Sequence, residues 1–311
     1  MYQHNESILT YFVIKGISDD PHLQLPLCVL VICIYIITLC GNFIILLLVI
    51  MDCKLQSPMY FFLANLSAMD ISLSTVSFYK LLDIYITRNK TISYFGCMSQ
   101  VFFYSSLVGN ELLLLSVMSY DRYLAICNPF HYSRIMRKKP CMYLALVCWV
   151  LGFLELIPYV VLLSNISCYK SNLINHFFCD IVPVMKLSCS NIRALEILIF
   201  TEGLLILNLC PCFFTFVPYM FIIISVMKIK SSSGKWKAFY TFSSHLTVVV
   251  IIYVTLGCQY LKPVSKDNLI SNKLYSFFNI AAVPMLNPLI YSLRNKVVKE
   301  AFIRKIKRLV H

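Results

Sequence analysis

The sequence predicts an all-α membrane protein, a bundle of seven transmembrane helices with its N-terminus outside the cell. Composition is the first reason: 59% of the 311 residues are hydrophobic and only 13% are charged, whereas a soluble domain has about 25% charged residues. The second reason is that long apolar stretches recur along the chain without period-two alternation. This pattern favours membrane helices over the strands of a barrel.

Seven stretches are long enough to be spans, since a helix needs about 20 mostly apolar residues to cross a hydrocarbon core roughly 30 Å thick. They are residues 25–50, 58–81, 97–126, 141–163, 195–227, 238–261 and 270–293. We therefore expect an outer tail at 1–24, a membrane domain at 25–293 and a cytoplasmic segment at 294–311. The tail has no cleavable-signal pattern, so the first span is expected to serve as an uncleaved anchor.

The distribution of basic residues sets the orientation. The loops near 51–57, 127–140 and 228–237 share one side with the C-terminal tail, and this side carries sixteen of the 27 lysines and arginines. The other side carries ten, diluted by seven acidic residues. Because basic loops remain in the cytoplasm, the N-terminus lies outside. The net charge of +13 is thus explained by the basic residues that orient the chain in the membrane, and we expect no nucleic-acid partner.

The C-terminal segment has its own pattern. Apolar residues recur at helical spacing among basic ones, at Val297, Val298, Ala301, Phe302, Ile306 and Leu309. Such a sequence predicts a short amphipathic helix that lies in the cytoplasmic membrane interface. A solvated basic tail is the alternative.

Of the fourteen cysteines, ten fall in spans or on the cytoplasmic side, where they act as small apolar residues or free thiols. Cys97, Cys168, Cys179 and Cys189 are placed outside, and four cysteines allow three pairings, which the residues alone leave open. The outer tail also carries a glycosylation acceptor at Asn5, in Asn5-Glu6-Ser7.

Polar residues at membrane depth are costly and usually face the bundle interior. Asp70 and Glu111 both fall near the middle of their spans, and Asn42 and Asn287 could join them in one buried cluster. Two close carboxylates would share a proton or hold a small cation such as sodium. A hydrogen-bonded structural network with neither is the alternative.

Asp121 and Arg122 form an adjacent pair of opposite charges at the inner end of the third span. An arginine in this place can hold a carboxylate in one state and release it in another. From charge alone, a simple interfacial anchor explains the pair as well.

The residues around this pair are more specific. Residues 118–127, MSYDRYLAIC, resemble the MAYDRYLAIC signature of vertebrate odorant receptors, which are rhodopsin-like G-protein-coupled receptors. Four further stretches resemble the same family in the right order: Gly41-Asn42, then residues 57–70, 237–246 and 284–295. The resemblance covers essentially the whole chain.

The resemblance implies a switch for a heterotrimeric G protein, formed by Asp121, Arg122, Tyr123, Tyr219 and Tyr291. It also implies the disulfide pairs Cys97–Cys179 and Cys168–Cys189, and it matches Asp70, Glu111 and Asn287 to the buried, ion-linked cluster of the family. The expected function is detection of a small volatile or water-soluble odorant, with a stimulatory G protein raising cyclic AMP. The expected location is the plasma membrane of an olfactory sensory neuron.

Some residues depart from the family pattern. Pro218 stands where the family usually has serine, and it removes a backbone donor from the fifth span. Gln56 replaces a histidine in the first inner loop. Tyr240 and Phe242 replace small residues at the inner end of the sixth span. These departures affect expectations about basal activity and coupling rather than about the fold.

A small, mostly apolar ligand should bind in an enclosed outer cavity with a few polar groups. The outer half of the third span offers one helical face for such a cavity, and spans 5 to 7 offer further residues. The candidates are Tyr104, Ser105, Val108, Gly109, Leu112, Gly203, Leu207, Tyr253, Leu256, Gly257, Tyr260, Phe277 and Ile280. Small residues among them could equally serve close helix packing.

Other functions are less consistent with the sequence. A transporter also has intramembrane acids, but no internal repeat is visible and few helices are interrupted by glycine. An enzyme is not expected, since no paired-histidine metal motif, phosphate loop or nucleophile elbow occurs. The same receptor fold with a non-olfactory metabolite as its ligand remains open.

Overall fold

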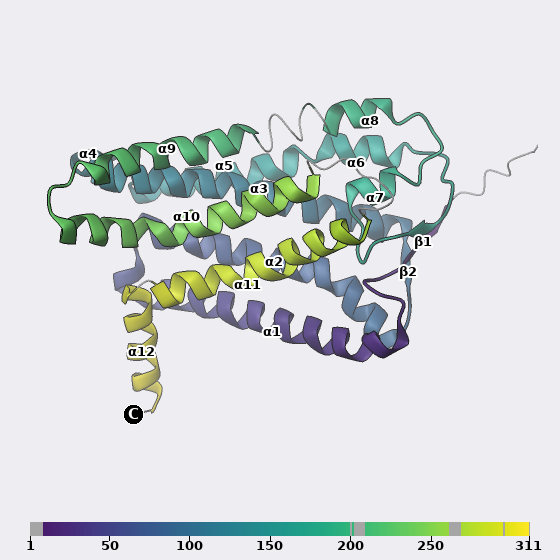
Figure 1. Cartoon of the computed structure of the whole chain (residues 1–311), viewed down its shortest axis with the longest axis horizontal. Helices are drawn as coiled ribbons and strands as arrows, with labels where there is room; N and C mark the ends of the chain where they lie inside the picture. The colour runs from purple at the N-terminus through teal and green to yellow at the C-terminus, as the bar shows by residue number, and fades with distance from the viewer. Residues whose placement is uncertain (1–8, 200, 202–208, 261–268, 295, 311) are drawn as a thin grey trace, which may run out of the picture.

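The computed structural model describes residues 9–199, 201, 209–260, 269–294 and 296–310. Long helices run side by side along the molecule, with a small sheet and short helices at one end and α4 and α12 at the other (Figure 1). The bundle is made of α1 (Pro21–Met51), α2 (Pro58–Thr87), α3 (Tyr94–Cys127), α5 (Lys138–Leu154), α6 (Ile157–Ser164), α9 (Cys210–Met227), α10 (Ser232–Tyr260) and α11 (Leu269–Arg294).

Within the described ranges these helices form seven columns, because α5 and α6 follow one another as a single column. Five columns are long and apolar enough to cross a membrane by themselves: α1, α2, α3, α5 with α6, and α9. Helix α10 contributes a shorter apolar stretch, His245–Cys258, and α11 packs against α1, α2 and α10. The predicted seven-helix fold is therefore confirmed.

The boundaries of the helices follow local chemistry. Proline opens α1 and α2, where its missing N–H costs nothing. The side chain of Asp20 caps α1 by accepting from the His22 N–H, and Ser93 caps α3 by accepting from the Gly96 N–H. The fourth span, predicted as continuous over 141–163, is interrupted between α5 and α6. Pro158 lies in the first turn of α6 and has no N–H to continue the ladder.

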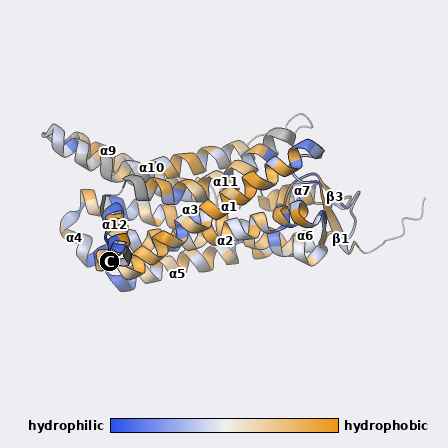
Figure 2. Ribbon diagram, turned by 90° about the horizontal axis from the view of Figure 1, so that it is seen from below, coloured by the Kyte–Doolittle hydropathy of each residue, from blue (hydrophilic) through white to orange (hydrophobic). Residues whose placement is uncertain are grey.

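Apolar residues cover the outside of the bundle as well as its interior. Leu25 and Ile50 of α1 are 74% and 71% exposed, as expected of side chains that face lipid. Figure 2 shows hydrophobic residues along the length of the helices, with hydrophilic residues concentrated at the end that carries α4 (Pro129–Ile135) and α12. The exposed apolar surface and the polar end agree with a membrane orientation.

The outer end is closed by a three-stranded sheet. Its central strand is β1 (Tyr11–Ile14), which pairs antiparallel with β2 (Thr91–Ser93) and parallel with β3 (Leu173–Ile174). The side chains of Phe12 and Ile14 in β1 are fully buried. Two short helices, α7 (Ile181–Met185) and α8 (Arg193–Leu198), complete this end.

The inner end is crossed by α12 (Lys296–Val310), which turns away from the bundle axis (Figure 1). Val298 and Ala301 are buried in a large apolar cluster that also includes Leu55, Met118 and Ile222 and is called the inner core below. Arg304 donates to Asp52 at 2.7 Å, next to the 3-10 helix η1 (Cys53–Leu55). This hydrogen bond lowers the pKa of the Asp52 carboxyl.

Candidate functional site

Asp121 is tightly held at the inner end of α3. Arg122 donates to one carboxylate oxygen at 2.6 Å, and the hydroxyl of Tyr132 donates to the other at 2.9 Å. Asp121 is 1% exposed and the Arg122 side chain 11%. Charge-assisted bonds of this kind are among the strongest in proteins, so the pair is fixed in this state. Sequence reasoning named Asp121 and Arg122 but missed Tyr132, which lies on α4.

A second contact joins α9 to α10. The hydroxyl of Tyr219 is hydrogen-bonded to Nδ1 of His245, and Tyr219 is 1% exposed. His245 is part of the stretch 237–246 that carried the family resemblance, but its role was missed because only the fold shows that it faces Tyr219. Phe242 packs against Tyr219 with ring centroids 6.2 Å apart.

The other predicted switch residues lie nearby or outside the described part. Tyr123 packs against the inner core and near Phe221, with ring centroids 6.0 Å apart. The side chains of Tyr240 and Tyr291 lie outside the described residues. Helix α9 continues through Pro218, and the Ser119 hydroxyl of α3 donates to the Thr215 carbonyl at 2.6 Å.

The predicted buried polar cluster is partly assembled. The side-chain amide of Asn287 donates to both oxygens of Asp70, at 3.1 and 2.9 Å, and lies 3.5 Å from a Glu111 oxygen. Asn42 does not bond to this group, since its amide donates to the carbonyls of Thr38 and Pro284. Asn42 therefore links α1 to α11 beside the cluster.

The cluster suits a hard cation. Asp70 is fully buried and Glu111 is 4% exposed, and two buried carboxylates need a proton or a counter-ion. Oxygen ligands are what such cations prefer. The Asn287 Oδ1 has no hydrogen-bond partner in the described part of the chain, so one oxygen besides the carboxylates is available.

A small cavity adjoins the cluster, with which it shares Glu111. It measures about 20 Å³ and is lined by Leu73, Tyr104, Val108, Glu111, Ile252, Leu256, Asn279, Ile280 and Val283. Four of these, Tyr104, Val108, Leu256 and Ile280, were predicted as ligand contacts. Glu111 and Asn279 were not predicted to face a ligand cavity, and they give it a polar side.

The other described candidates do not line this cavity. Tyr253 lies 3.3 Å from the Thr215 hydroxyl, and Leu112 belongs to the inner core. Phe277 packs against Phe177 with ring centroids 6.0 Å apart. Three further candidates for ligand binding are described and do not line the cavity: Ser105, Gly109 and Gly257. Gly203, Leu207 and the side chain of Tyr260 lie outside the described residues. The predicted glycosylation site, Asn5, also lies outside them.

The outer loop packs against Tyr104, one of the residues that line the cavity. Disulfides join Cys97 to Cys179 and Cys168 to Cys189, which confirms both predicted pairs. Phe178, beside the first disulfide, is fully buried and meets Tyr104 edge-to-face at 4.7 Å. Gln100 of α3 accepts from the Cys179 N–H at 2.9 Å. The Cys97–Cys179 disulfide and this hydrogen bond fix the loop to α3.

Two ionisable groups of the outer loop are buried. Burial, together with the nearby Lys273 ammonium, lowers the pKa of His176 to about 3. Burial raises the pKa of the Asp180 carboxyl to about 6, against the opposing effect of the hydrogen bond from the Ile181 N–H. In the folded loop His176 is therefore neutral at neutral pH, and Asp180 takes up a proton at a higher pH than an ordinary aspartate.

Comparison with known proteins agrees with this arrangement. A family model described as "Olfactory receptor" matches residues 31–308. Human olfactory receptor 6C3 is 42% identical over 99% of this chain and 97% of its own length. Mouse olfactory receptor 5AR1 is 42% identical over 97% of each chain. The crystal structure of squid rhodopsin aligns with 95% of this chain and 91% of its own, with a TM-score of 0.68 and 18% sequence identity.

The seven-helix bundle, with its charged pair at the inner end and its disulfide-closed outer end, shares its fold with squid rhodopsin. The chain belongs to the olfactory receptor family. It is accordingly a multi-pass protein of the plasma membrane.

Proposed function

We propose that a small, mostly apolar odorant binds between α3, α10 and α11, and that the receptor then activates a stimulatory G protein to raise cyclic AMP. The observation that carries this proposal is the arrangement of Asp121 between Arg122 and Tyr132. It holds Arg122 in one position, which would be the resting position of the proposed switch.

The outer cavity supports the ligand part of the proposal. A cavity of about 20 Å³ holds one water molecule, whereas small-molecule sites measure about 300–1,000 Å³. An odorant must therefore separate the side chains around Tyr104, Leu256 and Ile280 in order to enter. A ligand that binds only the expanded form shifts the receptor towards that form.

The polar cluster lies between the cavity and the inner switch. We propose that Asp70, Glu111 and Asn287 hold a sodium ion, which would supply the positive charge that two buried carboxylates require. Glu111 both lines the cavity and reaches Asn287. Expansion of the cavity would then disturb the cluster directly.

A panel of odorants applied to cells with a cyclic AMP readout tests the function. At least one odorant should raise cyclic AMP in cells that express the receptor, and Arg122→Ala should abolish the response at equal surface expression. An odorant response that persists undiminished in Arg122→Ala would contradict the role of the switch. Replacing external sodium by an organic cation tests the cluster, since agonist potency should change in the parent receptor and not in Asp70→Asn.

A further inference from the structure

A groove of about 540 Å³ opens on the outer half of the bundle, between α2, β2 and the first turns of α3. Its lining is polar at the outer end, at Lys80, Asp83, Asn89, Thr91 and Ser93. Deeper in the membrane the lining includes Val76, Tyr79 and Phe103. Neither the family resemblance nor the proposed odorant cavity uses this groove.

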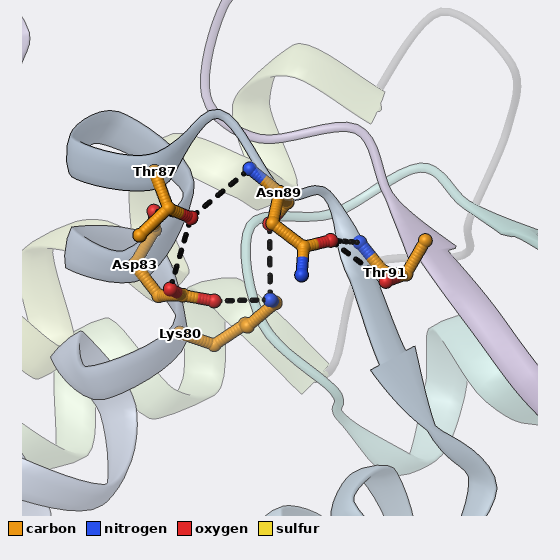
Figure 3. Close-up of polar contacts among 5 residues, drawn as sticks. All are labelled: Lys80, Asp83, Thr87, Asn89 and Thr91. Carbon is orange, nitrogen blue, oxygen red and sulfur yellow. Dashed lines mark hydrogen bonds and ion pairs between the residues drawn. The ribbon is translucent and has the colours of Figure 1, made fainter.

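The outer end of the groove is organised by a buried lysine. Lys80 is only 4% exposed, and its ammonium donates to Asp83 at 2.5 Å and to the Asn89 carbonyl at 3.0 Å. Thr87 donates to the other Asp83 oxygen at 3.1 Å. Figure 3 shows these side chains converging from the end of α2 and the loop that follows it.

The loop itself is held in a fixed shape. Arg88 has a left-handed backbone with φ 62°, and the Asn89 Oδ1 accepts from both the N–H and the hydroxyl of Thr91, at 2.9 and 2.7 Å. These bonds connect the loop after α2 to β2 (Figure 3). The polar end of the groove is therefore formed before any ligand arrives, which reduces the entropy cost of binding.

The groove faces lipid and is separate from the odorant cavity. Tyr79 and Phe103 on its rim are 67% and 46% exposed, in a bundle whose exposed apolar residues contact acyl chains. Gln100 forms the wall between the groove and the interior, because its amide nitrogen donates to the Val76 carbonyl and its oxygen accepts from Cys179. A ligand would enter from the outer leaflet.

We propose that this groove binds a membrane sterol, with the sterol hydroxyl at the Lys80–Asp83 pair and the ring system along Val76, Tyr79 and Phe103. A hydroxyl group both donates and accepts, so it can donate to the Asp83 carboxylate and accept from the third N–H of Lys80. The rigid ring system loses little entropy on binding. The polar end lies outermost, as a sterol in the outer leaflet requires.

Charge favours a sterol over a phospholipid. Asp83 already neutralises Lys80 at 2.5 Å, so a phosphate group would meet a carboxylate at the same place as the ammonium. Like charges in so confined a site repel each other. A neutral hydroxyl avoids this repulsion.

The test uses the full-length receptor in cell membranes and a photoreactive sterol with an alkyne handle, followed by mass spectrometry of the labelled peptides. Label should fall on residues of α2 and α3 that line the groove. Ser99 of α3 also lines the groove, so Ser99→Trp should fill it with an indole and reduce labelling at least about tenfold. Leu146→Trp is the matched control, since Leu146 of α5 is a lipid-facing residue, 59% exposed, outside the groove.

Asp83→Asn provides a second variant that keeps the shape of the side chain and removes its charge. It should weaken sterol labelling several-fold, which is less than the reduction expected for Ser99→Trp. Labelling that is unchanged in Ser99→Trp, or that falls outside the groove, would overturn the proposal. Labelling of the groove by a photoreactive phosphatidylcholine, in preference to the sterol, would overturn it as well.

Discussion

The hydroxyl of Tyr132 donates to Asp121 at 2.9 Å, across the turn that joins α3 to α4. Arg122 occupies the other oxygen of the same carboxylate. Both bonds hold Asp121 in this state. Tyr132 fixes the carboxylate in the position in which it binds Arg122, so loss of the Tyr132 bond should make it easier for Arg122 to depart.

Tyr132→Phe should raise basal signalling. A hydrogen bond to a charged group contributes about 1.5–3 kcal/mol, and losing about 1.5 kcal/mol from the resting state shifts the ratio of active to resting receptor about tenfold. Basal cyclic AMP at matched surface expression is the measurement. Tyr143→Phe is the control, since Tyr143 on α5 is 68% exposed and should leave basal signalling unchanged; equal effects of the two variants would count against the prediction.

The contact between Tyr219 and His245 should couple the two residues energetically. His245→Phe frees Tyr219 and should raise basal cyclic AMP about fivefold, the equivalent of ~1 kcal/mol. In a Tyr219→Phe background the same change should have no further effect, because the bond is already absent. A double-mutant cycle of basal activity measures this coupling, and simple additivity would show that the contact is unimportant.

Gly152 should not tolerate a larger residue. A Cβ at this position would overlap the Asn110 side-chain oxygen and lie 2.8 Å from the Asn110 backbone nitrogen. Gly152→Ala should therefore lower stability by about 2 kcal/mol through overpacking between α3 and α5. Asn110→Ala should rescue part of the loss, as judged by thermal unfolding in detergent. Gly234→Ala, where a Cβ meets only side chains at 3.1 Å or more, is the control.

The two disulfides should differ in importance. Cys97–Cys179 closes a loop of 82 residues and Cys168–Cys189 one of 21, for which loop entropy predicts contributions of ~4.5 and ~3 kcal/mol. Cys97→Ser should reduce surface delivery more than Cys168→Ser. Cys33→Ser, at an exposed free cysteine, should have no effect. The reverse order, measured by flow cytometry, would refute the loop-length argument.

The stability of the outer loop should depend on pH through His176. The pKa of His176 is about 3 in the folded loop against 6.5 for an ordinary histidine, so the unfolded state binds a proton first as the pH falls. Its contribution to stability is complete above pH 6.5 and is lost progressively from there towards pH 3. His176→Gln should flatten this part of the curve of melting temperature against pH. An unchanged slope would contradict the assignment.

Asp180 acts in the opposite sense. Its pKa is about 6 in the fold against 3.8 for an ordinary aspartate, so its stabilising contribution is complete below pH 3.8 and is lost as the pH rises through about 6. Asp180→Asn keeps the acceptor for the Ile181 N–H but cannot ionise. The variant should therefore lose less of its melting temperature between pH 4 and pH 7.5 than the parent receptor does. Comparing the two single variants separates the two groups.

Hydropathy was sufficient to predict the helices, because each must satisfy its own backbone within lipid. Hydropathy could not locate the break between α5 and α6 after Leu154. Pro158 accompanies this break, but many membrane helices continue through a proline. The outer sheet was missed because its strands span two to four residues, too short for any alternation. Contacts such as Tyr219–His245 join residues 26 apart in sequence and follow only from helix packing.

The position of β1 has a consequence for the order in which the receptor is made. Val13 pairs with Thr91 of β2 and also with Leu173 of β3. β1 is the first strand to leave the ribosome, but the sheet around it cannot be completed until β3 has been synthesised. Until then one edge of β1 is open to pairing with other chains. Delivery to the cell surface should therefore depend on the late formation of this sheet. Substitutions in Tyr11–Ile14 should cause retention inside the cell, while the receptors that do reach the surface should still signal.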